Sequence, residues 1–344
     1  MSLLRWRGAA GALGADGTAE QGSVGRAGPG ATALTWPDAE AEAGAGRLDA
    51  SLWKAVPPSE RRDSPFSSAA KSGLLRTCSN PHCASGWLHL LRSRQTPVFE
   101  GGWCCSVACT RARVEAAVRR EMEARGQTRD SHRHRVPLGL AMLEQGWITQ
   151  QDLRAALQAQ RAAGGRLGDW LVRQKSASEE QVTRALGLQW SCPVLSLDFH
   201  NPEDLAVLLP RLFLDAFGAL PLRVAAGRIL YLGFEDRIDP ALALAAERMT
   251  GLRVEAGVVQ SSLFRAAHTH ALQTHFPPAE LIEAANEQAM AAALARAIEA
   301  ARPVAAHLVR VHECLWLRLW LRPQTGPLPD PGSIRDLIAS TATH

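Results

Sequence analysis

The chain has 344 residues, 46% of them hydrophobic, and a formal net charge of +4 at pH 7. This length and apolar content allow two or three domains with hydrophobic cores. No apolar run approaches the roughly 18 residues that a transmembrane helix needs, so we expect no membrane insertion. Seven cysteines, an odd number, and the lack of a convincing signal peptide predict a protein of the reducing cytoplasm.

Residues 1–72 are rich in Gly, Ala, Ser, Pro and charged residues, and they show neither helical nor strand periodicity. A segment of this composition cannot bury enough apolar surface to offset the entropy lost on folding. We therefore predict a disordered tail over residues 1–72.

Residues 73–126 contain five of the seven cysteines, as CSNPHC and, after twenty residues, CCSVAC. Two cysteine pairs at this separation in a reducing compartment predict a tetrahedral zinc site. Zinc binding would supply the folding free energy that so short a segment lacks. The second group resembles the cysteine knuckle of treble-clef zinc fingers, in which the last cysteine opens a helix, and the sequence from Ala108 onward is helical in pattern.

The expected zinc ligands are Cys78, Cys83, Cys105 and Cys109. Cys104 can take the place of Cys105, because Cys104 and Cys109 repeat the spacing of the first pair. His82 is a weaker candidate. The alternative is a group of buried cysteines that binds no metal.

Residues 137–189 contain one pattern written twice. The copies are PLGLAMLEQGWITQQDLRAALQAQ, residues 137–160, and RLGDWLVRQKSASEEQVTRALGLQ, residues 166–189, so a shift of 29 superimposes them. A repeat of this period indicates one supersecondary unit used twice. The spacing of apolar residues and the caps at Thr149 and Ser178 predict helix, turn and helix in each copy. On periodicity alone, each copy is a helical hairpin that buries its leucines.

The doubled pattern, Arg-Leu-Gly followed by a turn, two spaced leucines and a closing Gln, resembles the MshEN domain. This domain forms the N-terminal part of many type II secretion (GspE) and type IV pilus assembly ATPases. The resemblance covers residues 127–276 and implies a bacterial protein that binds cyclic di-GMP. By motif position it implies these ligand-binding residues: Arg135, Leu138, Gly139, Leu153, Leu157, Gln160, Arg166, Leu167, Gly168, Asp169, Val182, Leu186 and Gln189. Asp236 lies in a turn that resembles a turn of the family and can accept a guanine N–H; the alternative is an ordinary turn cap.

The chemistry suits such a ligand. Arginine pairs with guanine edges or phosphate and stacks on bases, and leucines give an apolar bed for base and ribose. The copies depart from the pattern at Pro137, where the second copy has Arg166, and at Lys175, where the first copy has its turn glycine. Losing one motif arginine removes a contact of about 1–3 kcal/mol. These departures favour an alternative, a protein-interaction module whose nucleotide site has decayed.

Residues 190–276 predict a small α/β subdomain: a strand at 193–197, a hairpin around Gly227, a helix ended by Gly251, a strand at 253–260 and a helix capped by Ser261. For residues 277–344 we predict a helix at 278–301, then a single alternating strand at 307–322 and a mobile end from residue 323. The Trp and Arg face of that strand either forms an interface or covers the protein's own core.

The predicted fold is α+β, with a disordered N-terminus, a small zinc module, a helical tandem-repeat subdomain packed with a small α/β subdomain, and a C-terminal helix and strand. The chain has no Gly-Lys pair, so the phosphate loop of the ATPases is missing. We therefore expect a non-enzymatic regulatory or docking protein of a secretion or pilus machine that senses cyclic di-GMP and has a protein partner there. A second alternative is a zinc-dependent nucleic-acid-binding protein.

Overall fold

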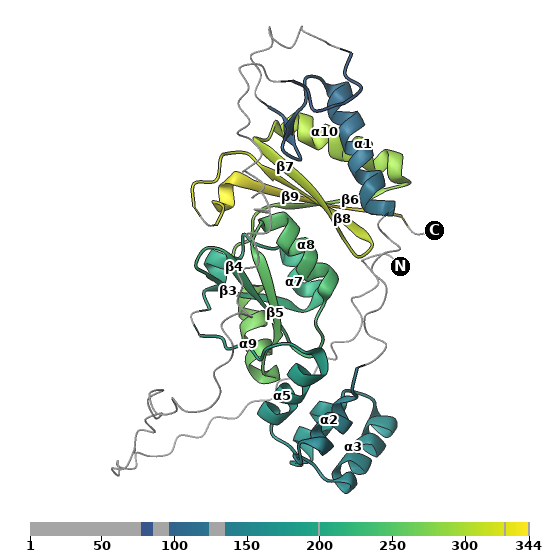
Figure 1. The fold of residues 1–344 in the computed structure, drawn as a ribbon, viewed down its shortest axis with the longest axis vertical. Helices are drawn as coiled ribbons and strands as arrows, with labels where there is room; N and C mark the ends of the chain where they lie inside the picture. The colour runs from purple at the N-terminus through teal and green to yellow at the C-terminus, as the bar shows by residue number, and fades with distance from the viewer. Residues whose placement is uncertain (1–76, 85–95, 124–134, 199, 327, 343–344) are drawn as a thin grey trace, which may run out of the picture. The chain divides into compact units, whose positions relative to one another are not determined.

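The structure is a computed structural model, and the part of the chain that it describes consists of residues 77–84, 96–123, 135–198, 200–326 and 328–342 (Figure 1). The predicted disordered tail lies outside these residues. The described residues mix helices with small sheets, so the predicted α+β class is confirmed. None of their helices combines the length and the apolar character needed to cross a membrane.

The cysteine-rich segment forms a short hairpin followed by a helix. Its elements are β1 (Val98–Phe99), β2 (Gly102–Trp103) and α1 (Val107–Glu123). The helix begins one residue before Ala108, which agrees with the prediction, and Cys109 lies in its first turn. The helix is charged on its exposed side and buries Val114, Ala117 and Val118. An amphipathic face of this kind is expected to pack against another element.

The tandem repeat folds as two helical hairpins. The elements are α2 (Leu138–Glu144), α3 (Gln150–Ala163), α4 (Leu167–Arg173) and α5 (Glu179–Trp190). Both predicted capping boxes are present, Thr149 with Asp152 and Ser178 with Gln181. The turns are also equivalent, because Lys175 has a φ of 58°, close to the 68° of Gly146 at the matching position. The fold of the turn therefore survives the loss of its glycine.

The α/β subdomain follows directly. Its elements are α6 (Pro202–Leu205), α7 (Arg211–Phe217), β3 (Ala219–Ala225), β4 (Ile229–Phe234), α8 (Pro240–Thr250), β5 (Arg253–Val258) and α9 (Ser261–Ala271), with the strands in the order β3-β4-β5. The predicted hairpin, the α8 helix ended by Gly251, and β5 are confirmed. The predicted strand at 193–197 is wrong: only Val194 forms a bridge, to Val258.

The predicted serine cap on α9 is also wrong. The cap residue is Gln260, which makes no side-chain capping bond, and the Ser261 hydroxyl donates to Glu235 instead. The Ser261 hydroxyl therefore bonds to a carboxylate distant in sequence and does not cap its own helix. Tertiary contacts decide between these two partners.

The C-terminal segment differs most from its prediction. Its elements are β6 (Ala279–Ala284), α10 (Glu287–Ala301), β7 (Ala305–Val311), β8 (Cys314–Trp320), η6 (Pro331–Ser333) and β9 (Ile334–Thr341). The predicted helix starts only after its cap at Asn286, because the preceding residues form β6. The predicted single strand is a hairpin that turns at His312, and the end that was expected to be mobile forms β9. The sheet order is β6-β9-β8-β7, so β9 is an inner strand.

The turn at His312 explains the error. It places Val311 opposite Cys314, so the alternation of side chains between the two faces changes phase across the turn. Trp316 and Trp320 therefore share a face with Val309 and join the core of the α/β subdomain. The Trp and Arg face covers the protein's own core, the second of the two alternatives.

Both faces of β8 are covered. The leucine face of β8 packs with α1 and α10, which lie side by side across it (Figure 1). On the opposite face, Arg318 is 1% exposed and its guanidinium donates to both carboxylate oxygens of Asp336 at 2.7 Å. A second arm of Arg318 donates to the Val207 carbonyl at 2.8 Å. This buried ion pair is satisfied on every side, as burial of charge demands.

Candidate functional site

The two motif glycines have the same structural role. A Cβ atom on Gly139 would lie 2.6 Å from Leu153 Cδ1, and one on Gly168 would lie 2.7 Å from Val182 Cγ1. These distances are shorter than carbon–carbon contact allows, so any larger residue would force Leu153 or Val182 to shift where the two helices of each hairpin meet. This constraint is structural and exists in both copies.

The closing glutamines also act alike, and each one bonds across to the other copy. Gln160 donates to the Gly165 carbonyl at 2.9 Å, and Gln189 donates to the Val136 carbonyl at 3.0 Å. Gly165 and Val136 are themselves matching positions, each directly before a copy's first residue. The two copies therefore exchange equivalent contacts, which relates them by an approximate two-fold arrangement.

A cavity of about 430 Å³ opens beside copy two. Its walls come from α4, α5, the residues after β4 and the start of α9. Nine of the fourteen residues predicted to bind ligand line it, and they are Leu138, Arg166, Leu167, Gly168, Asp169, Val182, Leu186, Gln189 and Asp236. The predicted residues outside the lining are Arg135, Gly139, Leu153, Leu157 and Gln160. Copy one thus contributes a single side chain.

The polar part of the cavity is a cluster of arginines and carboxylates. The Arg166 guanidinium lies 2.8 Å from Glu235 Oε1 and 3.1 Å from Asp236 Oδ2. Arg265 lies 2.6 Å from the same Glu235 oxygen. Sequence reasoning missed Glu235 and Arg265. The acidic pair at the end of β4 was a usable signal for Glu235, whereas nothing local marks Arg265.

The pKa values of the two neighbouring carboxyls, Glu235 and Asp236, are shifted in opposite directions. Burial raises the pKa of Glu235, but hydrogen bonds from Ser261 and Arg265 outweigh it and hold that pKa below its ordinary value. Burial also raises the pKa of Asp236, and here the nearby Arg166 does not compensate, so the pKa stays above its ordinary value. Two carboxyls in one cluster thus have pKa values shifted in opposite directions, because only Glu235 receives hydrogen bonds that outweigh its burial.

Arg135 contacts Trp190, a residue of the cavity lining. Its guanidinium carbon lies 3.2 Å from the centre of the Trp190 ring, a cation–π contact. The indole N–H of Trp190 donates to the Asp236 carbonyl at 2.9 Å. Arg135 was predicted as a ligand residue, and the structure places it against Trp190 outside the cavity lining.

The cysteine-rich segment brings its four predicted ligands together. The sulfurs of Cys78, Cys83, Cys105 and Cys109 all lie within 4.8 Å of one another. Cys83 and Cys105 are 3.5 Å apart, and Cys105 and Cys109 are 3.6 Å apart. Tetrahedral zinc with Zn–S bonds of about 2.3 Å places its sulfurs about 3.8 Å apart, so this cluster could hold such an ion.

Of the two adjacent residues Cys104 and Cys105, which the spacing left as alternatives, the structure places Cys105 in the cluster. Cys104 lies outside the cluster, with its sulfur 3.6 Å from the Ser79 hydroxyl. The Asn80 amide donates to the Cys109 sulfur at 3.3 Å, an outer hydrogen bond typical of metal-binding thiolates. His82 contributes no ligand atom to the cluster.

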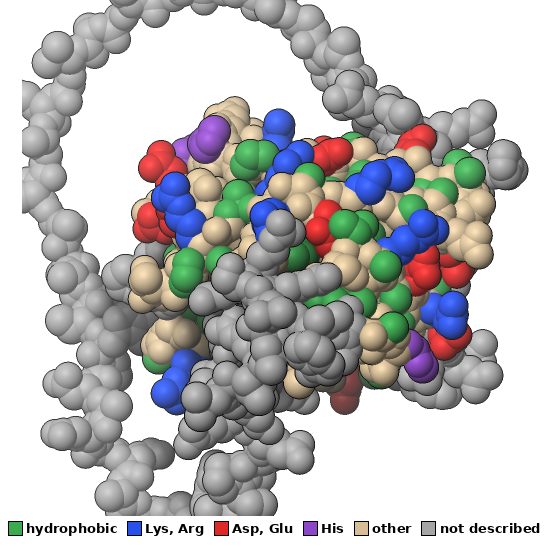
Figure 2. Space-filling view, turned by 90° about the horizontal axis from the view of Figure 1, so that it is seen from above, with side chains coloured by type: hydrophobic (Ala, Val, Ile, Leu, Met, Phe, Trp, Pro, Cys, Tyr) green, Lys and Arg blue, Asp and Glu red, His purple; other side chains and the backbone are tan. Residues whose placement is uncertain are grey.

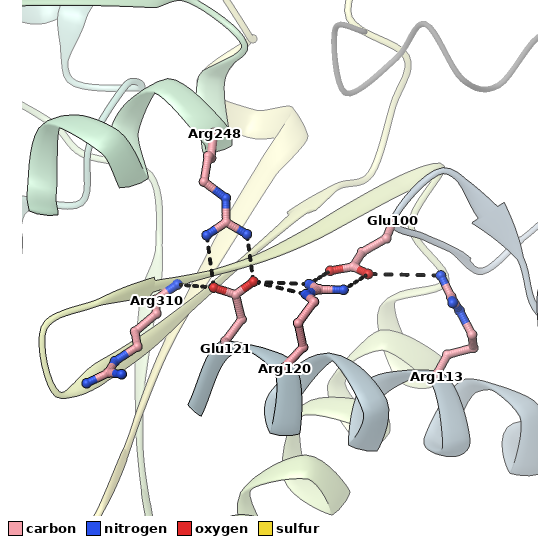
Figure 3. A network of polar contacts seen from close by, with 6 residues as sticks. All are labelled: Glu100, Arg113, Arg120, Glu121, Arg248 and Arg310. Carbon is pink, nitrogen blue, oxygen red and sulfur yellow. Dashed lines mark hydrogen bonds and ion pairs between the residues drawn. The ribbon is translucent and has the colours of Figure 1, made fainter. Parts of the chain in front are cut away.

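A polar network connects α1 to the α/β subdomain (Figure 3). Arg248 of α8 donates to both oxygens of Glu121, at 3.0 and 2.6 Å, and the Arg310 backbone N–H donates to the same carboxylate at 3.2 Å. Burial raises the pKa of Glu121, but the bonds from Arg248 outweigh it and the pKa lies below its ordinary value. The Glu121 side chain is 3% exposed, so removing one partner would leave a buried charge.

The other end of α8 is held as well. The Asp239 carboxylate caps the helix by accepting from Ala241 and Leu242, and it also contacts His312 at 2.5 Å. This hydrogen bond raises the pKa of His312. Because Asp239 follows the cavity residue Asp236 by three positions, α8 links the cavity wall to the C-terminal sheet.

Comparisons with known proteins place the repeat region in context. No protein-family model matches the chain. The type IV pilus assembly ATPase PilB of Thermus thermophilus is 33% identical over 143 residues, which is 41% of this chain and 16% of PilB. The chain thus spans about a sixth of the length of this relative.

Two solved structures are similar to this chain over a comparable share of its length. The structure of MshE with cdg is 27% identical and covers 40% of this chain and 99% of that one, with a TM-score of 0.32. The N-terminal domain of XpsE is 24% identical and covers 38% of this chain and 91% of that one, with a TM-score of 0.29. The matches fall on the N-terminal domain of the ATPases and not on the ATPase domain. The resemblance to the MshEN domain is confirmed.

Proposed function

We propose that this chain, whose MshEN-like domain covers about 40% of its length, is a non-enzymatic regulatory module of a bacterial secretion or pilus machine. It senses cyclic di-GMP in the cavity beside copy two and passes the signal to a protein partner. One observation carries the proposal: most of the ligand residues implied by the doubled motif line one cavity together with Asp236. Residues far apart in sequence have converged there.

The lining matches the parts of a guanine nucleotide. Arg166 and Arg265 supply guanidinium groups for a phosphate. The carboxylates of Asp169 and Asp236 can accept hydrogen bonds from the N–H groups on the guanine edge. Apolar side chains of α4 and α5 form the bed for base and ribose, as in most small-molecule sites.

Binding requires an exchange of partners. Arg166 forms ion pairs with Glu235 and Asp236, so a phosphate must compete with two carboxylates for it. The exchange moves the residues after β4, and α8 begins directly behind them. The ends of α8 contact Glu121 and His312, which gives the signal a route to the C-terminal sheet.

The cysteine cluster holds a structural zinc ion in this proposal. Zinc bound by four thiolates leaves no open coordination position, so it stabilises the fold and takes no part in catalysis. Purified protein should contain about one zinc ion per chain. Cys83→Ser and Cys109→Ser should each lose it, whereas Cys104→Ser, which removes a thiol outside the cluster, should keep it. Protein prepared without chelator that contains no zinc would contradict the assignment.

Isothermal titration with cyclic di-GMP tests the nucleotide site. Arg166→Ala should weaken binding by at least about tenfold, since it removes a charge-assisted contact. Arg184→Ala is the matched control, because among the described residues Arg184 pairs with the exposed Glu180 on α5 and does not line the cavity, and it should leave the affinity unchanged. The proposal would be falsified by wild-type protein that shows no binding at about 100 μM ligand.

A protein-interaction module with a decayed nucleotide site is the second candidate. The internal ion pairs of Arg166 favour it, because they satisfy the arginine without a ligand. In that case Arg166→Ala should lower the stability of the fold and leave nucleotide titrations flat. Nucleic-acid binding has less support: on the face seen in Figure 2 the described Arg and Lys side chains alternate with Asp and Glu, whereas nucleic acids select continuous basic surfaces.

A further inference from the structure

We propose that the cavity is half of a two-fold site and recognises a single guanylate unit, one base with one phosphate. This inference rests on the proposed function and specifies its ligand class: the protein binds GMP about as tightly as cyclic di-GMP. The observations that carry it are the two-fold relation of the copies and the unequal chemistry of their surfaces.

The two-fold relation predicts where a second half would bind. Each closing glutamine bonds to the residue before the other copy, so the copies are exchanged by one rotation. Cyclic di-GMP itself consists of two equal guanylate halves. A protein that used both halves symmetrically would need the residues around Arg166 again at the matching positions of copy one.

Copy one does not have them. The counterpart of Arg166 is Pro137, which offers no donor. The counterpart of Asp169 is Leu140, whose side chain is 54% exposed. The counterpart of Arg173 is Glu144, a reversal of charge. At each of these positions, copy one has lost or inverted the group with which copy two can meet a nucleotide.

The backbone has not diverged with the side chains. Pro137 precedes α2 with φ −57° and ψ 139°, and Arg166 precedes α4 with φ −98° and ψ 143°. Both conformations are open to any residue, so Pro137→Arg introduces no backbone strain. Copy one therefore keeps the shape of a half-site without its chemistry.

The α/β subdomain reinforces the asymmetry. Its contributions to the cavity, among them Glu235, Asp236 and Arg265, line the side of copy two, and Leu138 alone comes from copy one. The charged residues in the lining balance, with four arginines against four carboxylates: Arg166, Arg173, Arg237 and Arg265 against Asp169, Glu179, Glu235 and Asp236. This lining therefore has no surplus positive charge, and every phosphate that enters must displace a carboxylate from an arginine, which disfavours a ligand with two phosphates more than a ligand with one.

Titration calorimetry with GMP, cyclic di-GMP and AMP on the full chain tests the inference. For the wild type, the affinities for GMP and cyclic di-GMP should agree within about threefold, and AMP should bind at least about tenfold more weakly than GMP. The double variant Pro137→Arg with Leu140→Asp restores two of the three groups that copy one lacks. It should bind cyclic di-GMP at least about tenfold more tightly than the wild type does, with GMP affinity unchanged.

The control variant is Leu244→Asp. It places the same charge on an exposed leucine of α8, 51% exposed and away from the cavity lining, and it should leave the ratio of the two affinities unchanged. Wild-type protein that binds cyclic di-GMP at least about tenfold more tightly than GMP would overturn the inference and leave the proposed function intact. Equal binding of AMP and GMP would overturn the guanylate assignment, and binding of none of the three would overturn both proposals.

Discussion

The two copies of the repeat share the backbone conformation and contacts that shape the hairpin, and they differ in residues that line the cavity. The packing glycines, the capping boxes and the closing glutamines occupy matching positions and make matching contacts. On the cavity side, Arg166 and Asp169 are matched by Pro137 and Leu140. The difference teaches that folding constrains both copies alike, whereas the charged groups that line the cavity are present in copy two and not at the matching positions of copy one.

The glycines give the strictest test of equal folding roles. Gly139→Ala and Gly168→Ala should each destabilise the protein by about 2 kcal/mol, because the new methyl group overpacks the helix crossing in both copies. Chemical denaturation measures the change. Gly218→Ala is the control, since no atom lies within 4 Å of its Cβ position and its φ of 56° adds only backbone strain. A large loss for Gly168→Ala alone would indicate that copy one is not packed as copy two is.

The next largest expected loss of stability concerns the hydrogen bonds of the two closing glutamines. Gln160→Ala and Gln189→Ala each remove one side-chain hydrogen bond to a carbonyl of the other copy, which should cost about 1 kcal/mol. The two losses should be similar in thermal or denaturant unfolding. If Gln189→Ala instead weakened only nucleotide binding and left stability unchanged, its contact with Val136 would be incidental and its role would be that of a ligand residue.

The turns of the two copies have different residues in the same conformation. For this pair we expect one substitution to stabilise the protein. Lys175 holds a φ of 58° that favours glycine. Lys175→Gly should therefore stabilise the protein by about 0.5–1 kcal/mol, while Gly146→Ala in copy one should destabilise it by a similar amount. Unfolding curves that show Lys175→Gly to be destabilising would place the lysine side chain in a stabilising contact.

The smallest expected effect is a pH dependence of the copy-one capping box that the copy-two capping box lacks. Hydrogen bonds from the side chain and backbone of Thr149 lower the pKa of Asp152 below its ordinary value, whereas Gln181 in copy two does not titrate. A carboxyl with a lowered folded-state pKa stabilises the fold above its unfolded pKa, and this contribution disappears as pH falls through the folded pKa. Hydrogen exchange at the start of α3 should therefore lose protection below about pH 3.8 before α5 does. Asp152→Gln should remove the difference, and parallel loss in wild-type α3 and α5 would contradict it.

The sequence by itself determined the local features of this protein. The repeat, its caps and turns, the β3–β4 hairpin and the start of α1 all carry signals within a few residues of one another. The cysteine spacing named Cys78, Cys83 and Cys109 and left Cys104 and Cys105 as alternatives, and the structure places Cys105 with the other three sulfurs. The prediction was wrong where one strand and a hairpin have the same sequence pattern. An alternating run does not show that the chain turns back at His312.

Only the tertiary structure decided which groups meet across long separations. Glu121 and Arg248 are 127 positions apart and share no local pattern. The cluster of Arg166 with Glu235 and Arg265 likewise forms only when α9 and the end of β4 pack beside copy two. The same packing makes β9 an inner strand, although its residues follow a Pro-rich stretch typical of a loose end. Local propensity and periodicity act over a few residues, whereas burial and charge pairing depend on which elements finally pack together.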